Sequence, residues 1–257
     1  MMKEEISYSE ENEFWQTALE QDLFPGDLVA EIGLFFLGAP YKAATLETTG
    51  REKLVVNLDE FDCTTFVETV LAIARSTANG KLSPSEFQKN VKLIRYRQGK
   101  IDGYASRLHY FTDWLADNEK KKVLKNVSRL LGGAPRRKKI TFMTDHRELY
   151  AGLKSEAELS KMLLVEKKLS RKVFHIIAKG QASRRLTGIR QGDIIAFATD
   201  QEGLDVAHAG FAVRKGRVLH LLHASSKEGA VVISGQTLPA YLKSNKNFTG
   251  ILIARFT

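Results

Sequence analysis

An extended apolar run changes into a helical pattern within Asn57-Leu58-Asp59-Glu60-Phe61-Asp62-Cys63-Thr64-Thr65-Phe66-Val67-Glu68, the segment that holds the single cysteine of the chain. Apolar residues then recur at spacings of three and four, which predicts a helix with one apolar stripe from Cys63 to about Thr77. The N-terminus of a helix carries about half a positive charge, which favours a thiolate and lowers the pKa of a cysteine. Cys63 therefore lies where a nucleophile is expected, although free cysteine is also among the most buried residue types.

The composition predicts a folded protein with a large core, built as one elaborated domain or two small ones. The chain has 257 residues, of which 43% are hydrophobic and 27% charged. A single cysteine excludes an intrachain disulfide. The first residues, Met1-Met2-Lys3-Glu4-Glu5, do not resemble a signal peptide, and no apolar run approaches the length of a membrane span. We therefore expect no integral membrane segment.

The net charge of +9 favours an anionic partner, such as nucleic acid, an anionic membrane or a polymer of the bacterial wall. Basic residues cluster at Lys120-Lys121-Lys122, Arg136-Arg137-Lys138-Lys139, Lys167-Lys168 and Arg184-Arg185. Clusters of this kind are more commonly solvated helix faces and loops. Because no nucleic-acid motif accompanies them, we do not expect a nucleic-acid partner.

The order of the predicted elements indicates an α+β protein, with helices first and an antiparallel sheet last. Helical patterns cover Glu10 to Glu20, Asp27 to Leu37, Cys63 to Thr77, a capping box at Ser83-Pro84-Ser85-Glu86 with the helix that follows it to Gly99, Ser106 to Asn118, and Ser155 to Leu169. Strand patterns cover Lys53 to Leu58, Asp193 to Ala198, Val206 to Val213, Val218 to Ala224, Ala230 to Ser234 and Thr249 to Phe256.

A cysteine nucleophile needs a base, which is usually a histidine held by a third group. If Arg214-Lys215-Gly216-Arg217 is a two-residue hairpin turn, Arg214 pairs with Arg217, and His208 then pairs with His223. Directly paired residues share one face of a sheet, with β-carbons roughly 5 Å apart. His220 is expected on the opposite face. The weak point of this prediction is the turn, because a slip of one residue in the register would separate the two histidines.

At this point the sequence resembles the NlpC-type cell-wall cysteine hydrolases, the bacterial branch of the papain-like superfamily. The segments that carry the resemblance occur in the order of that family: Pro40-Tyr41, Asp62-Cys63, Gly192-Asp193-Ile194-Ile195, His208-Ala209-Gly210 and Leu222-His223-Ala224-Ser225. The resemblance implies that Cys63 is the nucleophile, His208 the base and His223 the group that orients His208. It also implies that Tyr41 helps to stabilise the oxyanion, together with the backbone N–H of Cys63.

The chain departs from that family in the long interval between Cys63 and His208. This interval contains residues 103 to 114 and 142 to 146, which together with the cysteine segment resemble the N-acetylmuramoyl-L-alanine amidase-like subfamily, formerly a domain of unknown function. The resemblance implies a single catalytic domain over residues 1 to 257. Its papain-like core would be a nucleophile helix packed on the antiparallel sheet, with N-terminal helices at about 9 to 50 and a mainly helical insertion at about 80 to 190.

The activity implied by the subfamily is hydrolysis of the amide between the lactyl group of N-acetylmuramic acid and L-alanine, in peptidoglycan or in muropeptide fragments. The insertion would then shape the substrate pocket. Tyr104, Tyr110 and Trp114 offer flat surfaces for sugar rings, and Arg107 and His109 offer hydrogen-bond donors. An aromatic stripe at helical spacing is, however, more commonly part of a core.

Two other functions stay open from the sequence. The same fold could cut within the stem peptide as an endopeptidase, in which case Asp62 would be free to bind a peptide amine. A non-catalytic wall-binding module has no need for Cys63, His208 and His223 together. No metal or other cofactor is expected, because a catalytic zinc usually takes three protein ligands and leaves a water site. A bacterial periplasmic or exported location is expected if a signal peptide has been removed, and a cytoplasmic location stays open.

Overall fold

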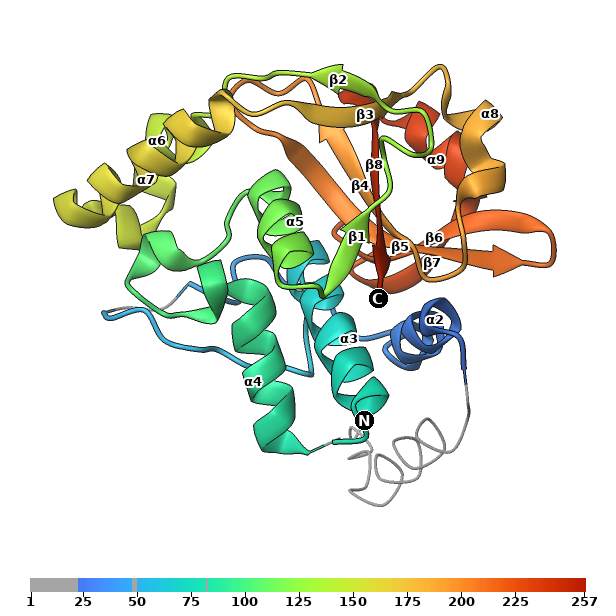
Figure 1. The fold of residues 1–257 in the computed structure, drawn as a ribbon, viewed down its shortest axis with the longest axis horizontal. Coiled ribbons are helices and arrows are strands. Elements are labelled where there is room, and N and C mark those ends of the chain that lie inside the picture. Colours follow the sequence, from blue (N-terminus) through green and yellow to red (C-terminus); the bar gives the residue numbers. More distant parts are fainter. Residues whose placement is uncertain (1–22, 48–49, 82) are drawn as a thin grey trace.

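The computed structural model describes residues 23–47, 50–81 and 83–257, and its centre is an antiparallel β-sheet (Figure 1). The strand order is β2-β3-β8-β4-β5-β6-β7, and β1 also pairs with β8. The strands are β1 (Leu124–Asn126), β2 (Ala134–Arg136), β3 (Phe174–Ala178), β4 (Ile194–Thr199), β5 (Val206–Lys215), β6 (Val218–Ser225), β7 (Ala230–Thr237) and β8 (Phe248–Phe256). The prediction of an α+β protein with an antiparallel sheet is confirmed.

Helices pack on both faces of this sheet. The α-helices of the described residues are α2 (Pro25–Phe35), α3 (Cys63–Ala78), α4 (Pro84–Arg95), α5 (Phe111–Lys120), α6 (Phe142–Asp145), α7 (Glu156–Ser170), α8 (Ala182–Arg185) and α9 (Leu238–Ser244). Figure 1 shows α6 and α7 at one end of the molecule, and α8 and α9 at the other. No helix among the described residues is both long enough and apolar enough to cross a membrane.

The alternation along β5 separates two hydrophobic cores. Ala209 and Phe211 face the core formed with α2, α3 and α5, whereas Ala212 faces the core that includes Leu238 and Leu242 of α9. Successive residues of a strand point to opposite faces, so His208 and Gly210 belong to the α9 face. The sheet is thus covered by the helix of Cys63 on one side and by α9 on the other.

Most of the predicted elements lie within one or two residues of the observed ones, but several differ. The helix predicted to begin at Ser106 begins at Phe111, and α9 was not predicted. The helix predicted at Glu10 to Glu20 lies outside the described residues. The strand predicted from Lys53 to Leu58 is not present. The insertion, predicted as mainly helical, adds β1, β2 and β3 to the sheet. These strands have three to five residues each, and β2 contains Pro135, so their sequences carry little strand pattern.

The Gly192-Asp193 segment at the start of β4 has a structural explanation. Gly192 has a φ of +72°, and a Cβ atom there would lie 2.0 Å from the carbonyl oxygen of Gly26. The side chain of Asp193 is fully buried and accepts hydrogen bonds from the Arg255 guanidinium at 2.7 and 2.8 Å. The segment therefore lets the start of α2 approach the sheet closely and joins β4 to β8.

Gly192→Ala should lower the free energy of unfolding by about 3 kcal/mol, because it adds a backbone clash to the cost of a left-handed conformation. The matched control is Gly216→Ala, in the β5–β6 turn, where φ is +60° and no atom lies within 4 Å of the added Cβ. Only the cost of the left-handed conformation, about 1 kcal/mol, is expected there. Urea denaturation measures both variants, and equal losses would show that the contact with Gly26 is unimportant.

Candidate active site

Cys63 is the first residue of α3, and Asp62 caps that helix. The Asp62 carboxylate accepts hydrogen bonds from the backbone N–H of Thr64 at 3.0 Å and of Thr65 at 2.7 Å, and the Thr65 hydroxyl accepts one from the backbone N–H of Asp62. This reciprocal pair satisfies two of the free N–H groups at the helix start. The first turn of α3 is therefore fixed, and with it the position of the Cys63 side chain.

His208 and His223 lie on the same face of the sheet and are hydrogen-bonded to each other. His208 Nε2 is 2.7 Å from His223 Nδ1, and the two ring centroids are 4.8 Å apart. The predicted register was wrong, because the two-residue loop is Gly216-Arg217 and Lys215 pairs with Val218. The turn moved by one position, which shifts the pairing by two residues. The face is unchanged by an even shift, so the histidines become diagonal neighbours in place of directly opposed ones.

Aromatic rings surround the histidine pair. The His208 ring stacks on Phe197 at 6.0 Å between centroids, and Tyr241 of α9 lies 6.2 Å from the His208 ring and 5.2 Å from the His223 ring. The third strand histidine, His220, was expected on the other face, and its Nδ1 lies 3.0 Å from the carbonyl oxygen of Ser234. It makes no hydrogen bond or ring contact with the pair among the described residues, whereas Tyr241 contacts both rings.

The thiol of Cys63 reaches β5 beside His208. Its sulfur accepts a hydrogen bond from the backbone N–H of Ala209, the amide group that follows His208 in the chain. This amide is available because the β5–β6 ladder ends at Phe211 and Leu222, while β6 continues to pair with β7. The N-terminal end of α3 therefore meets the sheet at the point where β5 and β6 separate.

The electrostatics differ from those expected at a helix N-terminus. Burial and then the negative charge of Asp62 raise the pKa of the Cys63 thiol to about 11, although the Ala209 N–H opposes this shift. Burial lowers the pKa of His208 to about 3, with a contribution from His223, and the pKa of His223 to about 4. At neutral pH the resting site thus holds a neutral thiol and two neutral imidazoles. The prediction of a lowered cysteine pKa was wrong because desolvation and Asp62 outweigh the helix N-terminus.

Tyr41 lies close to the thiol and is held by backbone contacts. Its N–H donates to the carbonyl oxygen of Gly229 at 2.8 Å, and it forms a parallel bridge with Phe61, two residues before Cys63. Burial raises the pKa of the Tyr41 hydroxyl, and the electrostatic effects of the neighbouring Cys63 and Asp62 add to the shift. The hydroxyl therefore stays protonated and remains a donor beside the thiol.

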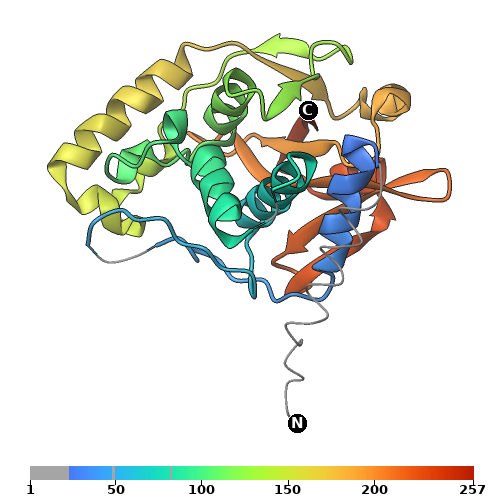
Figure 2. The same ribbon diagram turned by 60° about the horizontal axis from the view of Figure 1, so that its bottom comes forward.

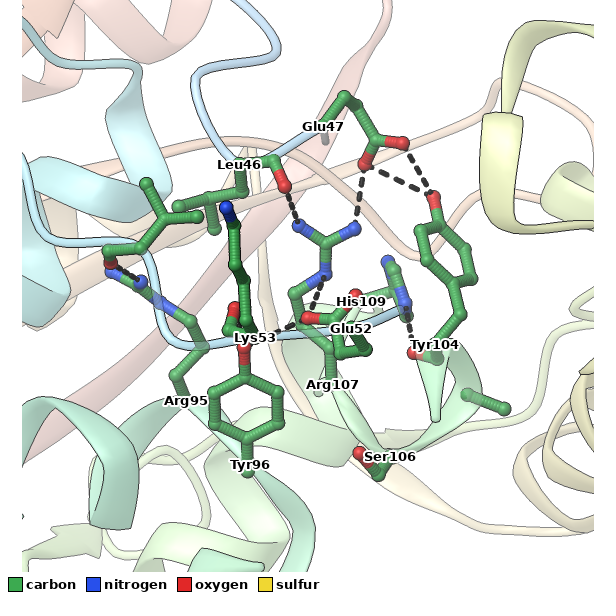
Figure 3. A network of polar contacts seen from close by, with 12 residues as sticks. Leu46, Glu47, Glu52, Lys53, Arg95, Tyr96, Tyr104, Ser106, Arg107 and His109 are labelled. Atoms are coloured by element: carbon green, nitrogen blue, oxygen red, sulfur yellow. Dashed lines mark hydrogen bonds and ion pairs between the residues drawn. The ribbon is translucent and has the colours of Figure 1, made fainter. Parts of the chain in front are cut away.

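Three of the residues expected to bind substrate belong to a buried polar network, shown in Figure 3. Arg107 is 5% exposed and donates to Glu47 at 2.6 Å and to the carbonyl oxygen of Leu46 at 2.9 Å. The Tyr104 hydroxyl donates to Glu47, and its backbone oxygen lies 2.9 Å from Nε2 of His109. The polar groups of Arg107 and Tyr104 are therefore occupied by contacts within the protein, because Glu47 supplies a carboxylate and Leu46 a carbonyl oxygen.

Tyr110 and Trp114 are also interior residues. The Tyr110 hydroxyl donates to the buried Glu166 at 2.6 Å, and Trp114 is fully buried and stacks on Phe111. The apolar stripe of α5 faces the core, as is common for aromatic residues at helical spacing. Neither ring is open to a sugar in this structure, so the expected sugar contact does not match the observed burial.

A groove of about 1090 Å³ opens beside the two imidazoles. His208, His223 and Tyr241 line it, and most of its other lining residues come from β7, from residues 225 to 228 and from residues 244 to 248. Tyr241 was not predicted as a site residue, because the sequence pattern was not interpreted as the helix α9. The available signal was Thr237-Leu238-Pro239, a capping threonine with a proline in the first helical turn. Among the described residues no cluster of three His, Cys, Asp or Glu side chains could hold a metal ion.

The neutral histidine pair should make the fold sensitive to acid. Below a pH of about 6.5 the unfolded chain takes up protons on these histidines and the folded chain does not, so the free energy of unfolding falls as the pH decreases toward 4. The slope is as much as about 1.4 kcal/mol per pH unit for each histidine. His223→Gln should reduce this slope, whereas the control His220→Gln should not. Urea denaturation between pH 7 and 4.5 measures it, and parallel curves for all three proteins would contradict a neutral pair.

Comparisons with solved structures support one family. An N-acetylmuramoyl-L-alanine amidase from Bacteroides uniformis is 42% identical, with a TM-score of 0.86 over 91% of this chain and 99% of that one. A protein from Bacteroides fragilis, provisionally named as a xylanase, is 43% identical, with a TM-score of 0.84 over 88% of this chain and 100% of that one. A Legionella pneumophila protein, 22% identical with a TM-score of 0.71 over 96% and 93% of the chains, shares the fold.

No curated protein matches the sequence. A family model described as "AmiA-like: N-acetylmuramoyl-L-alanine amidase-like" matches residues 31–251. This match includes α3, the histidine strands and the whole insertion. Because it spans most of the chain, the protein belongs to the AmiA-like family of N-acetylmuramoyl-L-alanine amidase-like proteins.

Proposed function

We propose that this protein is a cysteine-dependent N-acetylmuramoyl-L-alanine amidase with a papain-like, NlpC-type core. Its family supports a hydrolase that acts on peptidoglycan or muropeptides. The observation that carries the cysteine mechanism is the meeting of the Cys63 sulfur with the amide after His208, while His208 is hydrogen-bonded to His223. A thiol, an imidazole and a group that orients the imidazole are the parts that nucleophilic catalysis requires.

The hydrogen bond between the histidines assigns a role to each nitrogen of His208. Nε2 is engaged with His223, and Nδ1 has no hydrogen-bond partner among the described residues. In the proposed reaction Nδ1 takes the thiol proton as the Cys63 sulfur attacks the lactyl carbonyl. The same nitrogen then gives that proton to the amine of L-alanine as the C–N bond breaks. Water, deprotonated by His208, then attacks the thioester carbonyl, and the C–S bond breaks to release the muramoyl group as its carboxylic acid. His208 returns the proton to the Cys63 sulfur, which restores the thiol.

The resting pKa values favour proton transfer during attack over a permanent ion pair. The pKa of Cys63 lies near 11 and that of His208 near 3, so the neutral forms predominate before substrate binds. The negative charge that develops on the carbonyl oxygen then needs donors that are already in place. The Tyr41 hydroxyl and the backbone N–H of Cys63 are proposed for this role, since Tyr41 stays protonated beside the thiol.

The alternative functions are weaker on the same geometry. Asp62, which an endopeptidase was expected to use for a peptide amine, caps α3 through Oδ1. Glycoside hydrolysis, which the name of the Bacteroides fragilis protein would imply, normally uses two carboxyl groups that flank the bond. The groups that meet here are a thiol and two imidazoles. A periplasmic or exported location would suit the proposed substrate.

Cys63→Ala should abolish hydrolysis of a defined muropeptide, because no other group supplies the sulfur nucleophile. The wild-type digest should contain an intact peptide that begins with L-alanine, as measured by mass spectrometry. Activity should survive a chelator and be lost after treatment with iodoacetamide. Fragments cut within the stem peptide would indicate the endopeptidase, and saturable binding without any product would indicate a binding module.

Tyr41→Phe should lower kcat by about 10²- to 10³-fold, the usual effect of removing one oxyanion donor. The backbone of residue 41 makes the contacts that position it, so the fold should be retained. Tyr150→Phe, in the insertion, is the matched control and should keep the wild-type rate. Steady-state kinetics and thermal melting measure both effects, and a wild-type rate for Tyr41→Phe would remove Tyr41 from the mechanism.

A further inference from the structure

We propose that the groove beside the histidine pair binds the leaving peptide, and that Lys227 and Lys246 recognise a carboxylate on that peptide. This inference rests on the proposed amidase function and assigns the two sides of the scissile bond to two sides of the site. The peptide would occupy the space between β7 and α9, and the muramoyl group would lie on the side of Cys63 and Tyr41.

The position of the general acid decides which side of the site holds the leaving peptide and which side holds the muramoyl group. The group that protonates the leaving amine must lie within hydrogen-bond reach of its nitrogen. His208 is the proposed acid, and its ring belongs to the α9 face of the sheet, where it lines the groove together with His223. Cys63 arrives from the opposite face, on α3. The amine and the residues attached to it therefore continue into the groove.

The lining of the groove suits an extended polar chain. It offers serine, asparagine and glutamine side chains from β7 and from the segments at 225–228 and 244–248. Tyr241 lies beside both imidazole rings. The other apolar lining residues are Ala207, Val232, Ile233 and Phe248. The Tyr241 hydroxyl has no hydrogen-bond partner within the described ranges, and burial, with a contribution from Cys63, raises its pKa to about 12. A protonated donor thus lines the groove within electrostatic reach of the thiol.

The charge in the groove favours a carboxylate. Lys227 and Lys246 are exposed, and neither makes an ion pair or side-chain hydrogen bond with any described residue. The lining contains one acidic residue, Glu228, so two unpaired ammonium groups face one carboxylate. The lysines come from two separate segments, the β6–β7 turn and the segment after α9. A negatively charged peptide in the groove can therefore be attracted by both segments.

The test compares two muramoyl-L-alanyl dipeptides that differ in the second residue, which carries free carboxylates in one and carboxamides in the other. Lys246→Glu and Lys227→Glu should each raise KM for the free acid about tenfold, since like charges then face each other. Their KM for the carboxamide should change less than twofold, and kcat should be retained. Lys243→Glu is the matched control, because Lys243 is exposed on α9 but outside the groove lining.

Each outcome separates the two proposals. If the wild type cleaves neither compound, the amidase function itself is wrong. If the wild type cleaves both, and the groove variants raise KM equally for acid and carboxamide, or behave as Lys243→Glu does, then the groove does not recognise the peptide carboxylate and the amidase function stands. Thermal melting of each variant shows that the fold is retained, which is expected for substitutions of exposed lysines.

Discussion

The contact between the start of α3 and the amide of Ala209 is the constraint on which this site depends. A cysteine on one face of a sheet and two histidines on the other can meet only where the sheet allows passage. The pairing of β5 with β6 does not extend beyond Phe211 and Leu222, so the backbone N–H of Ala209, which precedes Phe211, is free to bond the sulfur. The capping carboxylate of Asp62 holds the helix start in that opening. The separation of β5 and β6 is thus as necessary for this arrangement as the cysteine and the histidines.

The sequence predicted the helix of Cys63 and the five C-terminal strands well, because each has a strong apolar period of its own. The assumed hairpin register predicted that His208 and His223 share a face, and this result survived an error in the turn. A change of register by an even number of residues leaves each side chain on the same face of the sheet, whereas an odd change moves it to the other face. The turn itself could not be placed, since Gly216 can occupy either position of a two-residue loop with a positive φ.

Long-range pairings account for what the sequence did not reveal. β1, β2 and β3 are short and become strands only because β8 and its neighbours offer edges to pair with. Arg107 and Tyr104 resemble ligand-binding residues in the sequence, and their actual partners, Glu47 and Leu46, are about 60 residues away. The pKa of Cys63 likewise depends on burial by residues distant in the chain, and the sequence of one helix does not reveal this burial.

The buried network has a consequence for catalysis. In Figure 2 the segment between α2 and α3 runs away from the sheet, out below the yellow α7 helix, and back. Arg95 and Arg107, both buried, donate to its backbone at Val55 and Leu46, and Arg95 also pairs with the fully buried Glu68 of α3. This segment joins Tyr41 to Cys63. The insertion therefore holds, at Leu46 and Val55, the segment that joins the proposed oxyanion donor Tyr41 to the proposed nucleophile Cys63. Positioning of this kind matters because small displacements of catalytic groups lower the rate of a reaction.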